Sequence, residues 1–129
     1  ANYRGYWGEE WETIVKFVKQ SNFKVVQVSS KNIPKIHGID LNMIQSTNIR
    51  QLLSLISCSQ LYIGMDGGVM HAAQALRIPG VAVFNKLHRA EFLCPVGTTI
   101  KAVHRGIDDN FEPEEIINTI QNVLRQRIF

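Results

Sequence analysis

Asp66, Gly67 and Gly68 form the stretch in which residue types and spacing most clearly suggest ligand chemistry. An apolar run, residues 61–65, precedes them, and a helix-forming run, residues 69–77, follows. Two glycines let the backbone approach a bulky anion closely. The free N–H groups and the partial positive charge at the start of a helix favour a phosphate group at this point. The pattern therefore predicts a phosphate-binding turn.

The sequence leaves two roles open for each residue around this turn. Asp66 either accepts hydrogen bonds from sugar hydroxyls or caps the helix. His71, in the first helical turn, either reaches the same crevice or is a partly buried helix residue. Gly67 and Gly68 also fit a plain turn, because glycine-rich turns between strand and helix are common and only some hold phosphates.

Periodicity and turn residues predict the elements that position these side chains. Residues 61–65 form a strand, residues 69–77 a helix that Pro79-Gly80 stops, and residues 81–84 a second strand. Strand, tight turn, helix and strand make one βαβ unit of a parallel sheet.

Similar patterns on both sides of this unit predict the rest of the domain. They give a first helix with Trp11 and Val18 on its apolar face, strands at residues 24–28, 41–44 and 98–103, a helix over residues 48–57 with Thr47 as N-cap, and a last helix from Pro113. Alternation of this kind predicts an α/β domain, Rossmann-like, with a mostly parallel sheet and helices on both faces.

Two loops are expected to border the same cleft, because the carboxyl ends of parallel strands line the ligand crevice. Ser29 and Lys31 follow the strand at residues 24–28, and Lys86 and His88 follow the strand at residues 81–84. Lys31, Lys86 and His88 either contact an anionic ligand or are solvated surface residues.

The central stretch resembles the Asp-(Thr/Ser)-Gly-x-x-His-x-Ala-x-Ala-Leu…Pro-x-Val-x-(Leu/Ile)-Phe signature of glycosyltransferase family 9. The matching residues here are Asp66-Gly67-Gly68-Val69-Met70-His71-Ala72-Ala73-Gln74-Ala75-Leu76, followed by Ile78-Pro79-Gly80-Val81-Ala82-Val83-Phe84. This family contains the ADP-heptose:lipopolysaccharide heptosyltransferases. The resemblance covers about residues 3–103 and is specific over residues 58–84. Gly67 departs from it, since the family has a Thr or Ser hydroxyl at this place.

The resemblance implies that residues 1–129 are a single nucleotide-sugar-binding domain, the C-terminal half of a GT-B glycosyltransferase. The abrupt start at Ala1, without an initiator Met, suits an excised domain. The N-terminal acceptor domain would be absent from this chain and would carry the general base. We therefore expect no catalytic residue, no metal site and no cofactor here, and a chain that binds a donor without turning it over.

The resemblance also implies roles for individual residues. The amides of Gly67, Gly68 and Val69, together with His71, would hold the donor diphosphate, and Asp66 would hydrogen-bond the donor sugar. Arg4 matches the place where the family often carries a Lys or Arg that reaches the diphosphate, but it equally fits a solvated surface residue. The family often places an acidic residue for the ribose or base after the strand at residues 24–28, and this sequence has none there.

The implied donor is an ADP-sugar or another nucleotide-diphosphate sugar, and the implied acceptor is a lipid-linked or protein glycan. The pathway would be the synthesis of a bacterial surface glycoconjugate such as lipopolysaccharide. Two other functions stay open. One is a non-catalytic nucleotide- or sugar-binding module, which Gly67 and the missing acidic residue favour. The other is half of a nucleotide-sugar epimerase or hydrolase.

Composition limits the partners and the location. The net charge is +3 and the basic residues are scattered, which argues against a nucleic-acid-binding patch. No apolar run approaches the roughly 20 residues of a membrane span, and no signal peptide is visible. Cys58 and Cys94 predict reduced, buried thiols. These features favour the cytoplasm, with peripheral association at the inner face of the cytoplasmic membrane as an option.

Overall fold

The computed structural model describes residues 8–65, 67–84, 100–104 and 112–127. The chain divides into two compact units, Ala1–Gln51 and Leu52–Phe129. The units are described separately below. Every strand pair found among the described residues is parallel, as the alternating helices and strands predict.

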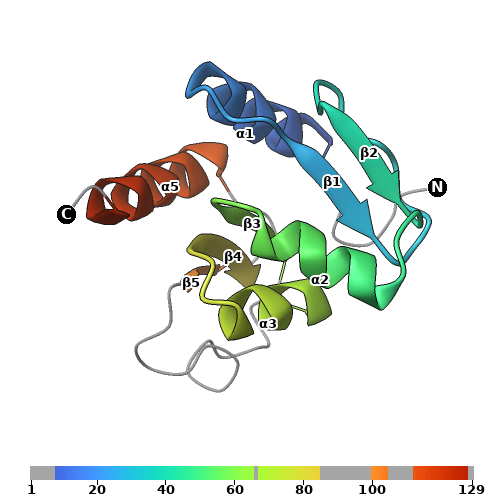
Figure 1. Ribbon diagram of the computed structural model, residues 1–129. Helices are drawn as coiled ribbons and strands as arrows, with labels where there is room; N and C mark the ends of the chain where they lie inside the picture. The colour runs from blue at the N-terminus through green and yellow to red at the C-terminus, as the bar shows by residue number, and fades with distance from the viewer. Residues whose placement is uncertain (1–7, 66, 85–99, 105–111, 128–129) are drawn as a thin grey trace. The chain divides into compact units, whose positions relative to one another are not determined.

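Unit 1 contains a helix and two neighbouring strands, α1 (Gly8–Gln20), β1 (Val26–Ser29) and β2 (Leu41–Ile44) (Figure 1). Glu9 and Glu10 lie in the first turn of α1 and Lys19 in the last, which complements the helix dipole. The buried side of α1 has helical spacing and consists of Trp11, Ile14, Val15 and Val18.

A left-handed residue ends α1. Asn22 has φ 69°, and its N–H donates to the carbonyl of Lys19, while the N–H of Phe23 donates to the carbonyl of Val18. These two bonds form a Schellman motif, in which Asn replaces the more usual glycine.

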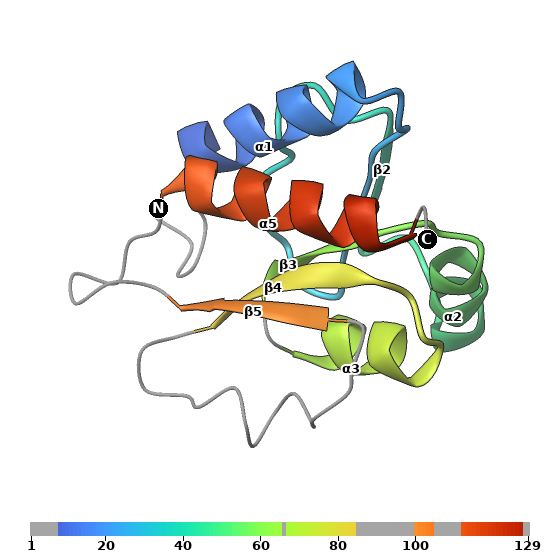
Figure 2. The same ribbon diagram turned by 90° about the vertical axis from the view of Figure 1, so that its left-hand side faces the viewer.

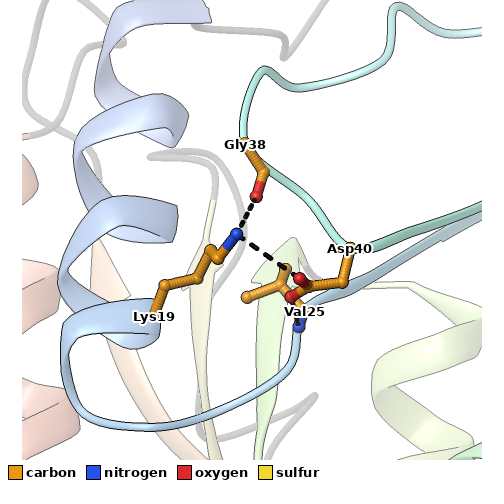
Figure 3. Close-up of polar contacts among 4 residues, drawn as sticks. All are labelled: Lys19, Val25, Gly38 and Asp40. Atoms are coloured by element: carbon orange, nitrogen blue, oxygen red, sulfur yellow. Dashed lines mark hydrogen bonds and ion pairs between the residues drawn. The ribbon is translucent and has the colours of Figure 1, made fainter.

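Lys19 and Asp40 hold the end of α1 to the starts of both strands (Figure 3). The Lys19 ammonium lies 3.4 Å from Asp40 Oδ1 and donates to the Gly38 carbonyl at 3.1 Å, and the Val25 N–H donates to Asp40 Oδ2 at 2.8 Å. The hydrogen bond from Val25, and then the contact with Lys19, hold the pKa of Asp40 below its ordinary value of 3.8.

Gln27 is a buried polar residue of β1 whose amide fixes the loop that follows the strand. Its Nε2 donates to the Pro34 carbonyl at 3.0 Å, and its Oε1 accepts from the Ile36 N–H at 2.7 Å. Both ends of the buried amide are therefore hydrogen-bonded, as a polar group out of water requires.

The second unit is a three-stranded parallel sheet with helices on both faces. Its strands run in the order β3-β4-β5. The elements in chain order, starting with a helix that crosses the boundary between the units, are α2 (Ile49–Ser57), β3 (Tyr62–Met65), α3 (Gly68–Ala75), β4 (Gly80–Phe84), β5 (Ile100–His104) and α5 (Pro113–Arg127).

The central strand β4 carries the core, because all five of its residues are buried. Ala82 and Phe84 belong to a cluster with Ile56 of α2 and with Met70 and Ala73 of α3. Side chains alternate along a strand, so Val81 and Val83 point to the opposite face. That face is covered by α5, which contacts β4 and β5 and buries Ile116, Ile120 and Val123. Figure 2 shows α3 and α5 on opposite faces of this sheet.

The helix of the central βαβ unit starts one residue earlier and ends two residues earlier than predicted. Arg77 has φ 57°, and its N–H donates to the carbonyl of Gln74, while the Ile78 N–H donates to the carbonyl of Ala73. This second Schellman motif ends α3 before Pro79 is reached. The predicted strands lie within one or two residues of the observed ones, and α5 begins at Pro113 as predicted.

Two local predictions are wrong. Thr47 is not the N-cap of α2, because Asn48 Oδ1 accepts from the Gln51 N–H at 2.8 Å and Gln51 Oε1 accepts from the Asn48 N–H at 2.9 Å. This reciprocal pair is a capping box built on Asn48. Cys58 is a free and exposed thiol rather than a buried one, since it lies just after α2 on the solvent side.

Candidate functional site

The predicted phosphate-binding turn lies between the carboxyl end of β3 and the start of α3. Gly67 and Gly68 are exposed, Val69 is half-buried and packs on the core cluster, and His71 is exposed. Four of the predicted donor-binding residues are therefore together at one helix N-terminus. His71 is therefore not partly buried, and its contact with a ligand stays a prediction.

Gly67 is the N-cap of α3 and has a backbone conformation, φ 155° and ψ −166°, that is essentially restricted to glycine. The Gly67 carbonyl accepts the first bond of the helix, from the N–H of His71 at 3.0 Å. The N–H groups of Gly68, Val69 and Met70 precede that bond and have no acceptor within the helix. Together with the helix dipole, these amides make a site that suits an anion.

His71 is oriented by a neighbour on the same helix. Its Nδ1 lies 3.2 Å from Oε1 of Gln74, which is three residues further along α3. Residues at this spacing are adjacent on a helix surface. When Nδ1 carries the proton, it donates to Gln74 Oε1. A hydrogen bond to a phosphate oxygen then requires the doubly protonated ring, in which Nε2 also donates.

The side chain of Tyr62, at the start of β3, extends along the strand toward the turn. Its hydroxyl donates to the carbonyl of Met65 at 2.6 Å. Met65 is the last residue of β3 and therefore the last strand residue before the turn.

No functional role was predicted for Tyr62 or Gln74. The signal for Gln74 is its position three residues after His71 in a predicted helix. The signal for Tyr62 is an aromatic residue two positions before a glycine in a predicted strand. It is a weak signal, because the spacing does not reveal which group the tyrosine hydroxyl contacts.

Ser29 and Lys31 lie in unit 1, at and after the end of β1. The Ser29 hydroxyl accepts from the N–H of Lys31 at 3.0 Å, and the Ser29 carbonyl accepts from the N–H of Gln45 at 2.7 Å. The hydroxyl therefore shapes the start of the loop, and the Lys31 side chain is exposed.

Four predicted site residues, Arg4, Asp66, Lys86 and His88, lie outside the described residues. Their roles stay predictions. Gly67 occupies the N-cap position of α3.

An open groove of about 760 Å³ lies in unit 1 along α1, beside His37 and Gly38. It is lined by carboxylates as well as ammonium groups, among them Glu9, Glu12 and Lys16. Carboxylates repel a diphosphate, and none of the predicted site residues lines this groove. The turn before α3 is therefore the better candidate for an anion.

The described residues contain no group of three or more His, Cys, Asp or Glu side chains that is able to hold a metal ion. None of their helices has the length and apolar character needed to cross a membrane.

Comparison with known proteins gives a family match and a structural match. The family model described as "Glycosyltransferase family 9 (heptosyltransferase)" matches residues 6–118. The structure of E. coli ADP-heptose LPS heptosyltransferase II is similar with a TM-score of 0.77 at 17% identity, over 93% of this chain and 42% of that one. At this identity the likeness shows the fold, and the chain spans less than half the length of that protein. A comparison with curated protein sequences finds no significant match.

Proposed function

Because the chain belongs to glycosyltransferase family 9, we propose that it is the part of a glycosyltransferase that binds the nucleotide-diphosphate-sugar donor. The sugar would be a heptose or a related sugar, and an ADP-sugar is the first donor to test. The chain covers 42% of the matched heptosyltransferase. We assign acceptor binding and the general base to a second, N-terminal domain outside this chain.

One observation supports the proposal most strongly. The two glycines at the start of α3 are exposed, lie at the carboxyl end of a parallel strand, and precede an exposed histidine in the same first turn. In open α/β sheets, ligands bind at the carboxyl ends of the strands. The first turn of a helix favours the negative charge of phosphates.

The mechanism of this part would be to hold the donor and to stabilise the leaving group. When the bond to the sugar breaks, negative charge builds on the nucleoside diphosphate. Amides of Gly67, Gly68 and Val69 that are already oriented would stabilise that charge without reorganisation. His71 would add a hydrogen bond, Asp66 would hold the sugar hydroxyls, and Arg4 would supply a positive charge.

Titration calorimetry with ADP, GDP, UDP and their sugar conjugates tests the proposal. We expect one nucleotide to bind, and its saturation to raise the free energy of unfolding by about 2.7 kcal/mol at a hundredfold excess over Kd. His71→Ala should weaken binding by about 10- to 100-fold, the value of a hydrogen bond to a charged group.

His37→Ala is the matched control, because His37 is also exposed but belongs to the loop before β2 in unit 1 rather than to α3. It should bind as the wild type does. Absence of binding by the wild type to every nucleotide, or unchanged affinity in His71→Ala, would contradict the proposed role of this turn.

A non-catalytic binding module is the second candidate, and Gly67 favours it because the Thr or Ser hydroxyl of the family motif is missing. Sugar transfer by the full-length protein decides between the two. If the full-length protein releases nucleoside diphosphate only when an acceptor glycan is present, it is not a non-catalytic binding module. If it binds the donor without such release, it is not a glycosyltransferase.

We also propose that the protein acts in the synthesis of a bacterial surface glycoconjugate, in the cytoplasm or at the inner face of the cytoplasmic membrane. A donor made in the cytoplasm and a lipid-linked acceptor would meet there. Fractionation of cells that express the full-length protein tests this location.

A further inference from the structure

Tyr62 and Gly64 form a pair on one face of β3. Side chains two residues apart in a strand point to the same side. A Cβ built on Gly64 would lie 2.6 Å from the Tyr62 hydroxyl oxygen and 3.0 Å from its Cζ. The tyrosine ring therefore occupies the space that a side chain at position 64 would need.

The absence of that side chain lets the Tyr62 hydroxyl reach the Met65 carbonyl oxygen, at 2.6 Å. The Tyr62 N–H donates to the Pro79 carbonyl at 2.9 Å, so the backbone groups of Tyr62 face β4. Backbone groups alternate between the two edges of a strand. Met65, three residues further on, therefore directs its carbonyl away from β4, and the hydroxyl supplies the donor that β4 does not.

This hydrogen bond acts on the chain where it enters the turn. A peptide bond is planar, so a fixed carbonyl also fixes the direction of the bond that follows it. The space beside the turn is open, since a Cβ built on Gly67 or Gly68 would meet no described atom within 4 Å other than those of its chain neighbours and the backbone of α3. The last peptide plane of β3 thus fixes the direction in which the chain leaves the strand, two residues before Gly67.

We propose that Tyr62 is a positioning residue for this turn. Its hydroxyl holds the Met65 carbonyl and thereby orients the amides of Gly67, Gly68 and Val69 toward a diphosphate. The effect on donor affinity rests on the proposed function, whereas the effect on the amides does not.

The test compares Tyr62→Phe with Ser59→Ala in the 129-residue chain. Ser59 is a matched control, because its half-buried hydroxyl also donates to a carbonyl, that of Leu55 at 2.9 Å, but it precedes β3. Amide NMR without ligand reports on Gly67 and Gly68, and calorimetry with ADP, GDP and UDP reports on affinity.

In Tyr62→Phe we expect the amide signals of Gly67 and Gly68 to shift. Nucleotide affinity should fall by about 2- to 10-fold, the effect of one hydrogen bond. In Ser59→Ala both should remain as in the wild type, even where the melting temperature falls equally.

Gly64→Ala is a second route to the same result, because its methyl group would displace the Tyr62 ring without removing the hydroxyl. It should shift the same two signals. Unmoved signals and unchanged affinity in Tyr62→Phe, or equal effects in Ser59→Ala, would overturn the proposal. If the wild type binds no nucleotide while Tyr62→Phe still shifts the amide signals of Gly67 and Gly68, the proposed function fails and the positioning role of Tyr62 stands.

Discussion

At the scale of single residues, the two adjacent glycines of the turn differ in what they require. Gly67 has φ 155° and ψ −166°, a region open essentially to glycine, whereas Gly68 starts α3 without a positive φ. The departure of Gly67 from the family motif therefore matters for the backbone as well as for the lost hydroxyl.

Gly67→Thr, which restores a family residue, should lower the free energy of unfolding by about 1–3 kcal/mol, the cost of such backbone strain. Gly68→Ala is the control in the adjacent position. It should raise the same quantity by about 0.4–1 kcal/mol, because alanine restricts the unfolded chain and fits a helix. Urea unfolding measures both, and a Gly67→Thr protein as stable as the wild type would show that the turn has no such strain.

At the scale of elements, the start of α2 shows how two neighbouring residues compete for one cap. Thr47 and Asn48 are both good N-cap residues. Asn48 takes the position because Gln51 then lies three residues on and completes the capping box.

Asn48→Ala should lower the free energy of unfolding by about 1 kcal/mol, the usual effect of removing an N-cap. Thr47→Ala should change it much less, since the cap remains. Thermal unfolding of both variants is the measurement. A larger loss in Thr47→Ala than in Asn48→Ala would contradict the capping box.

The pairing of β3 with β4 depends on a second glycine. A Cβ on Gly80 would collide with the backbone carbonyl oxygen of Tyr62, which is its partner in the register. Backbone atoms of paired strands have little room to yield, so the strands would have to separate there.

Gly80→Ala should therefore destabilise the protein by about 1–3 kcal/mol, the usual range for overpacking. Shifted amide signals at Tyr62 and Gly80 would locate the change. Gly68→Ala again serves as control, because its added methyl group would meet no described atom within 4 Å other than those of its chain neighbours and the backbone of α3. Equal stability of the two variants would argue against a close approach of the strands.

At the scale of the whole molecule, Asp40 links stability to pH. The Val25 N–H and then Lys19 hold its pKa below 3.8, so the folded state binds the proton more weakly than the unfolded chain does. The contribution of this carboxylate is present above its unfolded pKa, and it is lost as the pH falls through the lower folded pKa.

The test compares the wild type with Asp40→Asn by urea unfolding from pH 7 to pH 2. The difference in free energy of unfolding should be constant above about pH 5 and should shrink below about pH 4. Lys19→Gln should reduce this dependence without removing it, since the Val25 hydrogen bond remains. A difference that does not change with pH would contradict the role of the charge.

The sequence alone determined the order of helices and strands, the family, and a compact candidate site. These features depend on signals that are local in the chain, such as helical spacing, glycines at a turn and Pro113 at a helix start. For the same reason Gly67, Gly68, Val69 and His71, which are at most four residues apart, could be placed together at one helix N-terminus before the structure was known.

The tertiary structure alone decided which groups meet across the chain or along a strand. It buries Ala82 and Phe84 with Ile56 and Met70, because β4 lies between two other strands with a helix layer on each face. It directs the Tyr62 hydroxyl to the Met65 carbonyl, because the register with β4 turns that carbonyl outward. Burial and backbone direction depend on partners that local spacing does not specify. For this reason only the tertiary structure reveals the hydrogen bond from the Tyr62 hydroxyl to the Met65 carbonyl.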